Sequence, residues 1–225
     1  MQVDGEYRRS GDRLAQEGFQ HMWATQIRND KRLGRSTKVD PTTLGSTVEA
    51  AMIDFGEGTV AARRHRNPDG STGGWVADTA HADADCYVEE HALVFGNARV
   101  FGRSRLLDHA RVYDYARLDD ASTASGFAQV SGSASVTASS ITERAVVTGE
   151  SRVTSATVRG EAWVIDRASI SNGAIAQDQA LLRGQAFVTD GAVVTGPAVV
   201  DGTVRGDVVV LDGHVQPVED VTAGS

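Results

Sequence analysis

The chain has 225 residues, a formal net charge of −8, only 6% aromatic residues and 24 glycines. This length allows one sizeable domain with an appendage, and the composition predicts a core of Val, Ala and Ile rather than of large rings. The charge is uneven, because residues 1–66 hold 11 Lys and Arg against 9 Asp and Glu, whereas residues 67–225 hold 11 against 21. An acidic region repels phosphates, so we expect no nucleic-acid binding there.

The N-terminal sequence MQVDGEYRRSGDRLAQEG contains no apolar run, and no stretch of the sequence has the length and hydrophobicity of a membrane span. These features predict a protein that is made in the cytoplasm without a signal peptide and that does not bind a membrane. The single Cys86 cannot form an internal disulfide, and no His and Cys residues have the spacing of metal ligands. We therefore expect no metal site.

Residues 1–47 are polar and are predicted to form an N-terminal arm. Within the arm, residues 12–30 are predicted to form an amphipathic helix, although Gly18 is unfavourable in it. The apolar residues near helical spacing are Leu14, Phe19, Met22, Trp23 and Ile27. Two arrangements stay open: the helix packs back on the region that follows, or the arm docks on another subunit or partner through Phe19, Met22 and Trp23.

Residues 48–73 are predicted to form a hairpin and a cap. The segments TVEAAMIDF and GTVAARRHR flank GEG, as in a short hairpin, and NPDGSTGG is typical of a turn. An uncovered strand edge leaves backbone hydrogen-bonding groups unpaired. We therefore expect this region to cover the open edge of the domain that follows.

From residue 74 to residue 213 the chain repeats with a period of six. An aliphatic residue recurs twenty times between Val88 and Val200, each time with a small residue two positions before it. Alternate side chains of a strand point to the same side, so each unit predicts a short strand followed by a turn. Three units would close a coil of eighteen residues, and stacking about seven such coils would bury one continuous core. The repeat predicts an all-β, three-sided solenoid, and residues 214–225 are predicted to be a C-terminal tail.

The repeat loses one residue after Ala138 and another after Ser155. When the units are sorted into coils of eighteen residues, both deletions fall on the third corner of the triangle, in successive coils. A three-sided solenoid tolerates deletions that are stacked on one edge, whereas random slips would scatter over the three corners. The same sorting places His91 and His109 one above the other on the first corner.

The stretch GGWVADTAHADADCYVEEHALVFGNARVFG resembles hexapeptide-repeat proteins, and is most similar to a group of bacterial and phage-encoded members described as candidate acyltransferases. Residues 73–76 match the opening of the solenoid in that group, and residues 96–102 match its repeat. The resemblance implies a left-handed parallel β-helix over residues 74–213. Many members of the family are homotrimeric acyltransferases that use an acyl-CoA and one histidine as general base between neighbouring subunits. Residues 1–47 match nothing in that group.

His91 and His109 are the candidate catalytic residues if the chain is such an enzyme. An imidazole on an exposed corner can act as base toward a hydroxyl or amine acceptor, with acetyl-CoA or another acyl-CoA as the donor. No insertion loop interrupts the repeat, however, and only a short tail follows it, whereas loops and tails commonly shape the pockets of the enzymes. The alternative is that both are solvated corner residues, and we favour no catalytic residue.

Aromatic side chains gather at the first coils of the predicted solenoid. Phe95 is expected to stack with Tyr113 on one face, with Phe101 on the next face. Exposed aromatic residues are a candidate contact surface, and a homotrimer is the usual way in which this family buries one.

The pattern as a whole predicts a non-enzymatic structural or binding β-solenoid that needs no cofactor. The phage-encoded proteins that it resembles favour a virion component, such as a capsid decoration or a tail-associated protein, that docks through its N-terminal arm. The alternative function is that of a homotrimeric acyltransferase that uses an acyl-CoA.

Overall fold

The computed structural model of the chain describes residues 50–56, 58–216 and 220–222. The chain divides into two compact units, one made of residues 1–45 and 50–61 and the other of residues 46–49 and 62–225. The predicted arm lies outside the described residues, together with its helix at 12–30 and its contact residues Phe19, Met22 and Trp23. Among the residues that the structure describes, no helix has the length and apolar character needed to cross a membrane.

In the first unit the structure describes β1 (Ala50–Asp54) and the beginning of β2 (Thr59–Arg66), two strands of the region predicted as a hairpin. Exposed and buried residues alternate along β1. The turn after β1 is closed by Asp54, whose Oδ1 accepts hydrogen bonds from the backbone N–H groups of Gly56 (2.8 Å) and Gly58 (3.2 Å). Both glycines have a φ above +100°, which side chains with a Cβ rarely adopt, so this turn depends on glycine.

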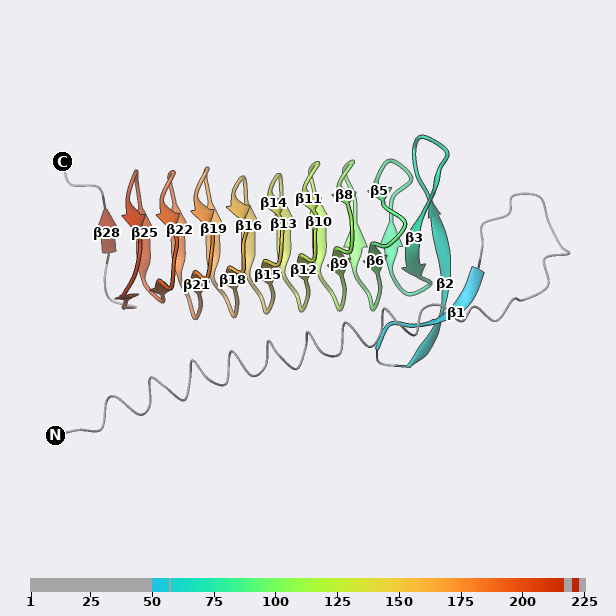
Figure 1. The fold of residues 1–225 in the computed structure, drawn as a ribbon, viewed down its shortest axis with the longest axis horizontal. Helices are drawn as coiled ribbons and strands as arrows, with labels where there is room; N and C mark the ends of the chain where they lie inside the picture. The colour runs from blue at the N-terminus through green and yellow to red at the C-terminus, as the bar shows by residue number, and fades with distance from the viewer. Residues whose placement is uncertain (1–49, 57, 217–219, 223–225) are drawn as a thin grey trace, which may run out of the picture. The chain divides into compact units, whose positions relative to one another are not determined.

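The second unit is a three-sided parallel β-solenoid, as predicted (Figure 1). Figure 1 shows its coils side by side, from the green strands β5 and β6 to the red strand β28. Each coil contributes one short strand to each of three sheets, which we name sheets A, B and C. Strands of successive coils pair in parallel within each sheet.

Within the second unit, sheet A begins with residues 62–66 of β2, which pair antiparallel with β3. It continues with the parallel strands β3 (Thr72–Ala77), β6 (Leu93–Val94), β9 (Arg111–Val112), β12 (Gln129–Val130), β15 (Val146–Val147), β18 (Trp163–Val164), β21 (Leu181–Leu182), β24 (Val199–Val200) and β27 (His214–Val215). Sheet B consists of β4 (His81–Ala82), β7 (Arg99–Val100), β10 (Arg117–Asp119), β13 (Ser135–Thr137), β16 (Arg152–Thr154), β19 (Ser169–Ser171), β22 (Phe187–Thr189), β25 (Thr203–Arg205) and β28 (Asp220–Thr222). Sheet C consists of β5 (Tyr87–Val88), β8 (Arg105–Leu106), β11 (Thr123–Ala124), β14 (Ser140–Ile141), β17 (Thr157–Val158), β20 (Ile175–Ala176), β23 (Val193–Val194) and β26 (Val209–Val210).

The core of the solenoid is formed by the residues that the repeat places inside. The aliphatic residues of all twenty units, from Val88 to Val200, have 0% relative exposure. The small residue two positions before each is at most 6% exposed. The strand register places each inward aliphatic residue beside an inward aliphatic residue of the next coil, as in the pairing of Leu118 with Val136. Each coil therefore buries its apolar edge against the coils on either side, and the core is continuous.

The described residues form eight complete coils, close to the predicted number of about seven. The excess over the twenty repeat units comes from both ends: β3 and β4 complete the first coil with β5 and place Val76 and Ala82 in register with the inward valines of the next coil, and β25 and β26 complete the last coil after Val200. The two glycines before Val76 are required by close packing. A Cβ on Gly73 would lie 2.2 Å from the carbonyl oxygen of Val88. A Cβ on Gly74 would clash in the same way with a backbone carbonyl oxygen of the next coil.

Residues 214–215 and 220–222 of the predicted tail form strands instead. The strands β27 and β28 continue sheets A and B in parallel register beyond residue 213. The six-residue spacing is lost in this part of the chain, which is why the sequence pattern fades. The inward positions nevertheless persist, since Val215 pairs with Val200, and Val221 pairs with Val204.

Carboxylates in the left-handed backbone conformation join successive coils at the corners. Asp is one of the few residues besides glycine that adopts this conformation readily. Each of three such carboxylates accepts a hydrogen bond from a glycine N–H of the next coil. The pairs are Asp108 with Gly126 (2.9 Å), Asp114 with Gly132 (3.0 Å) and Asp166 with Gly184 (2.9 Å).

Two buried side chains cap the N-terminal edge of sheet C, where β5 has no strand before it. Asn67 Oδ1 accepts a hydrogen bond from the N–H of Val88 (2.8 Å), and His65 Nε2 lies 3.0 Å from the carbonyl oxygen of Cys86. Because a carbonyl only accepts, His65 donates from Nε2–H. Burial lowers the pKa of His65, and this effect outweighs the opposing effect of its hydrogen bond to Cys86. The capping imidazole is therefore favoured in its neutral form.

We predict that the solenoid loses stability as the pH falls below the ordinary pKa of histidine, about 6.5. Since the pKa of His65 is lowered by folding, the unfolded chain binds a proton before the folded chain does. The stability that neutral His65 contributes is fully present when the pH is above the pKa of this histidine in the unfolded chain. It is lost as the pH falls from that pKa toward the lower pKa of His65 in the folded chain. Urea unfolding at about pH 7.5 and about pH 5.5 measures the change. His65→Gln, which keeps an N–H donor but does not titrate, should show a smaller difference, and an unchanged difference would contradict the assignment.

Candidate functional site

The first corner, between sheets C and A, carries a stack of three aromatic rings. The ring centroids of His91 and His109 are 5.2 Å apart with planes inclined by 13°, and those of His109 and Phe127 are 5.1 Å apart with planes inclined by 6°. The three residues come from successive coils, each of which places its turn residue directly above that of the coil before. The predicted alignment of His91 above His109 is confirmed.

The neighbours of these two imidazoles are rings rather than carboxylates. Among the described residues, the histidines that pair with a carboxylate are elsewhere: His81 Nε2 lies 2.7 Å from an oxygen of Asp83, and His214 Nε2 lies 2.5 Å from an oxygen of Asp201. A histidine base is commonly oriented by a third group that hydrogen-bonds to its second nitrogen. The described residues supply no such group at His91 or His109.

Two of the predicted contact residues form a second stack, on the outer face of sheet A. The rings of Phe95 and Tyr113 have centroids 4.9 Å apart and planes inclined by only 3°. The hydroxyl of Tyr113 donates a hydrogen bond to Oε1 of Gln129 in the next coil (3.2 Å). This stack confirms the predicted contact between Phe95 and Tyr113.

Phe101 lies apart from that stack, on the outer face of sheet B. The guanidinium carbon of Arg117 is 4.7 Å from the centre of its ring, and the ring of His81 is 6.3 Å away. The structure thus brings Phe95 and Tyr113 together and puts Phe101 on another face, as the repeat predicts.

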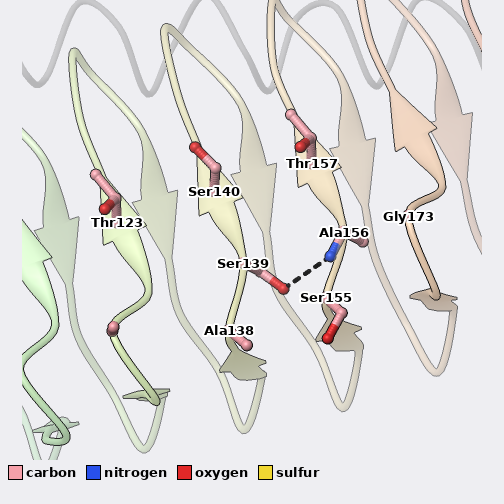
Figure 2. Close-up of a pocket in the computed structure, with 9 residues that line it drawn as sticks. Thr123, Ala138, Ser139, Ser140, Ser155, Ala156, Thr157 and Gly173 are labelled. Carbon is pink, nitrogen blue, oxygen red and sulfur yellow. Dashed lines mark hydrogen bonds between the residues drawn. The ribbon is translucent and has the colours of Figure 1, made fainter.

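The two deletions of the repeat produce a feature that the sequence pattern does not predict. Strand register shows that both shortened turns connect sheet B to sheet C, because the spacing between equivalent residues falls from 18 to 17 there. The corner recedes and leaves a shallow groove of about 440 Å³ (Figure 2). Hydroxyl groups of Thr123, Ser140 and Thr157 run along it in a row, above small residues. The coincidence of both deletions on one corner is the sequence signal for this groove.

Serine hydroxyls replace backbone hydrogen bonds in the shortened turns. Ser139 N–H donates to the hydroxyl of Ser122 (3.1 Å), and the N–H of Ala156 donates to the hydroxyl of Ser139 (3.1 Å; Figure 2). In turns of ordinary length the equivalent N–H donates to a carbonyl three residues earlier, as in Ala110 to Leu107. Serine therefore occupies the small position where an unsatisfied N–H would otherwise be buried.

A polar network joins the last coils on the outer face of sheet A. Arg183 holds Asp201 with two hydrogen bonds (2.8 and 3.1 Å), and Asp201 also accepts from Nε2–H of His214. The amide of Gln216 donates to Nδ1 of His214 (2.8 Å). Burial acts to raise the pKa of Asp201, but the hydrogen bonds from Arg183 and His214 outweigh it and lower that pKa. Within the described part of the chain, no group of three His, Cys, Asp or Glu residues could hold a metal ion.

We predict that Ser139→Ala destabilises the solenoid by about 2 kcal/mol, because the buried N–H of Ala156 loses its acceptor. Ser151→Ala is the matched control. Its hydroxyl is also buried at an inward position but has no hydrogen-bond partner among the described residues, so the substitution breaks no hydrogen bond and should not destabilise the solenoid. Free energies of unfolding from urea titration measure both. Equal losses in the two variants would refute the role given to Ser139.

No family model, no curated protein and no solved structure matches the chain. The resemblance to hexapeptide-repeat proteins therefore rests on the repeat itself and on the residues quoted for it. The described surface offers three kinds of feature that bear on function: two stacks of aromatic rings, a hydroxyl-lined groove and polar networks that link neighbouring coils.

Proposed function

We propose that the chain is a non-enzymatic β-solenoid with a structural or binding role. The stack of His91, His109 and Phe127 carries this proposal. The two imidazoles that an acyltransferase would use as base lie face to face with other rings, at centroid distances of 5.2 and 5.1 Å. A general base must reach the proton of its acceptor and is commonly oriented by a polar partner. Stacked rings instead provide a preformed contact surface.

The regularity of the coils supports the same proposal. Equivalent inward residues from Val76 to Val200 follow one another at 17 or 18 residues along sheet A, so no loop is inserted between these coils. In the enzymes that the sequence resembles, inserted loops commonly shape the pockets for the acyl-CoA and the acceptor. A solenoid without such loops suits a stiff spacer or a binding surface.

We further propose that the protein is a homotrimer within a larger assembly, such as a phage particle, and docks there through residues 1–47. The similarity to phage-encoded repeat proteins supports the setting of a capsid decoration or a tail-associated protein. The aromatic stacks, including that of Phe95 on Tyr113, are suited to contacts with protein. The alternative is an acyltransferase that uses an acyl-CoA with His91 or His109 as base.

An acyl-transfer assay separates these two functions. We expect the full-length protein to release no thiol from acetyl-CoA above the blank, with hydroxyl and amine acceptors. The double variant His91→Ala/His109→Ala should behave in the same way. Thiol release that depends on the protein and disappears in the double variant would establish the acyltransferase and overturn our proposal.

The oligomeric state tests the proposed assembly. We expect sedimentation velocity of the full-length protein to give a mass three times the 23.8 kDa of one chain. A truncated chain that lacks residues 1–47 should keep the trimer if the arm serves a different partner. A full-length protein that stays monomeric over a wide range of concentrations would refute the homotrimer.

A further inference from the structure

A second hollow, of about 390 Å³, opens on the outer face of sheet B near the N-terminal end of the solenoid. It is lined by Thr79 and His81 from the first coil and by Arg99 and Phe101 from the second. None of these four residues belongs to the ring stacks of the first corner and sheet A. The hollow therefore needs an explanation of its own.

Each strand at this end of sheet B presents two outward residues, which form two columns along the solenoid. Strand register aligns the first column, and the backbone hydrogen bonds between coils align the second. Neighbouring coils are about 4.8 Å apart, so side chains within a column are in reach of one another. The first column is His81, Arg99 and Arg117, and the second is Asp83, Phe101 and Asp119.

In two of the three coils, the basic residue of the first column pairs with an acidic residue of the second column. His81 lies 2.7 Å from the carboxylate of Asp83, and Arg117 lies 3.4 Å from that of Asp119. In the coil between them, the residue two positions after Arg99 is Phe101, which has no carboxylate. Among the described residues, the guanidinium of Arg99 forms no ion pair. The hollow thus contains an exposed cation beside an aromatic ring, on a chain whose net charge is −8.

One side of the Phe101 ring is already covered. The guanidinium carbon of Arg117, from the following coil, lies 4.7 Å from the ring centre. The hollow lies toward the preceding coil, which contributes Thr79 and His81 to its lining. The ring of His81 is inclined by 45° to that of Phe101, with centroids 6.3 Å apart, so the two rings do not stack. The second side of Phe101 therefore borders the hollow.

We propose that this hollow binds a uronic acid residue of an acidic glycan. The apolar face of the sugar ring would pack on Phe101, and its carboxylate would receive hydrogen bonds from Arg99. The sugar hydroxyls would donate to the carboxylate of Asp83 and to the hydroxyl oxygen of Thr79, whose own proton is donated to the carbonyl oxygen of Gly96. The hollow supplies a cation, a flat apolar surface and hydrogen-bond acceptors together, which is the combination that a sugar acid requires.

The carboxylates beside the hollow favour a glycan over other anionic partners. Asp83 and Asp119 stand on both sides of Phe101 in the second column. An acidic peptide has neither hydroxyl groups to donate to them nor a rigid apolar ring face to pack on Phe101. A sugar acid instead brings hydroxyl donors that these carboxylates can accept. This inference names a ligand for the proposed binding role and rests on it.

Binding of trigalacturonate to the full-length protein, measured by titration calorimetry, tests the site. We expect Arg99→Gln and Phe101→Leu each to weaken binding about tenfold or more, because they remove the charge-assisted hydrogen bonds and the ring surface. Arg152→Gln is the matched control. It removes an exposed arginine from the same column of sheet B, where Ser135 and Ser169 are its neighbours, and should leave the affinity unchanged. Thermal unfolding of each variant verifies that the fold is retained.

Two further ligands make the outcome decisive. The methyl ester of trigalacturonate lacks the charge, and we expect it to bind at least about tenfold more weakly. A poly-glutamate peptide should not bind. The proposal is overturned if trigalacturonate does not bind, if Arg152→Gln weakens binding as much as Arg99→Gln, or if only the peptide binds. These outcomes are independent of acetyl-CoA turnover and of oligomeric mass. Glycan binding at this hollow can therefore be refuted while the proposed non-enzymatic function is retained, and the proposed function can be refuted while glycan binding is retained.

Discussion

The in-register stacking of the inward aliphatic residues is the interaction on which the rest of the solenoid depends. Each coil contributes a few small side chains to the interior, too few to hold the coil closed in water. When Val136 lies above Leu118 and Val153 above Val136, the apolar surface becomes continuous and the backbone of each strand pairs with both neighbours. All other features repeat because this register repeats. A side chain on the outer face therefore meets the side chain 17 or 18 residues away in the sequence, in addition to the one two positions along its own strand.

This constraint explains why the surface is organised in ladders. The rings of His91, His109 and Phe127 stack because their coils are stacked, and the same is true of Phe95 and Tyr113. Ladders of this kind are rigid, since each ring is held by the backbone pairing beneath it. Preorganised surfaces lose little conformational entropy on binding. The stacked rings therefore form a preorganised surface.

Departures from the repeat have local consequences that the repeat also controls. The two deletions shorten the same corner in successive coils, and the inward register is kept on both sides of them. The missing residue leaves a groove outside and an unsatisfied N–H inside, and the hydroxyls of Ser122 and Ser139 satisfy the latter. At the N-terminal edge, where no coil precedes β5, Asn67 and His65 take the place of the missing strand. Both cases show side chains replacing backbone pairing where the stack is interrupted.

The amino-acid sequence by itself determined the three-sided fold, the inward residues, the corner of the deletions and the stacking of His91 on His109, because all of these follow from a period of six. It did not determine the number of coils, since Val204 and Val215 keep inward positions where the spacing is irregular. The groove, the capping by His65 and the hollow beside Arg99 were decided only by the tertiary structure. Each depends on distances between side chains of different coils, and a periodic pattern specifies which residues share a face but not how their polar groups meet.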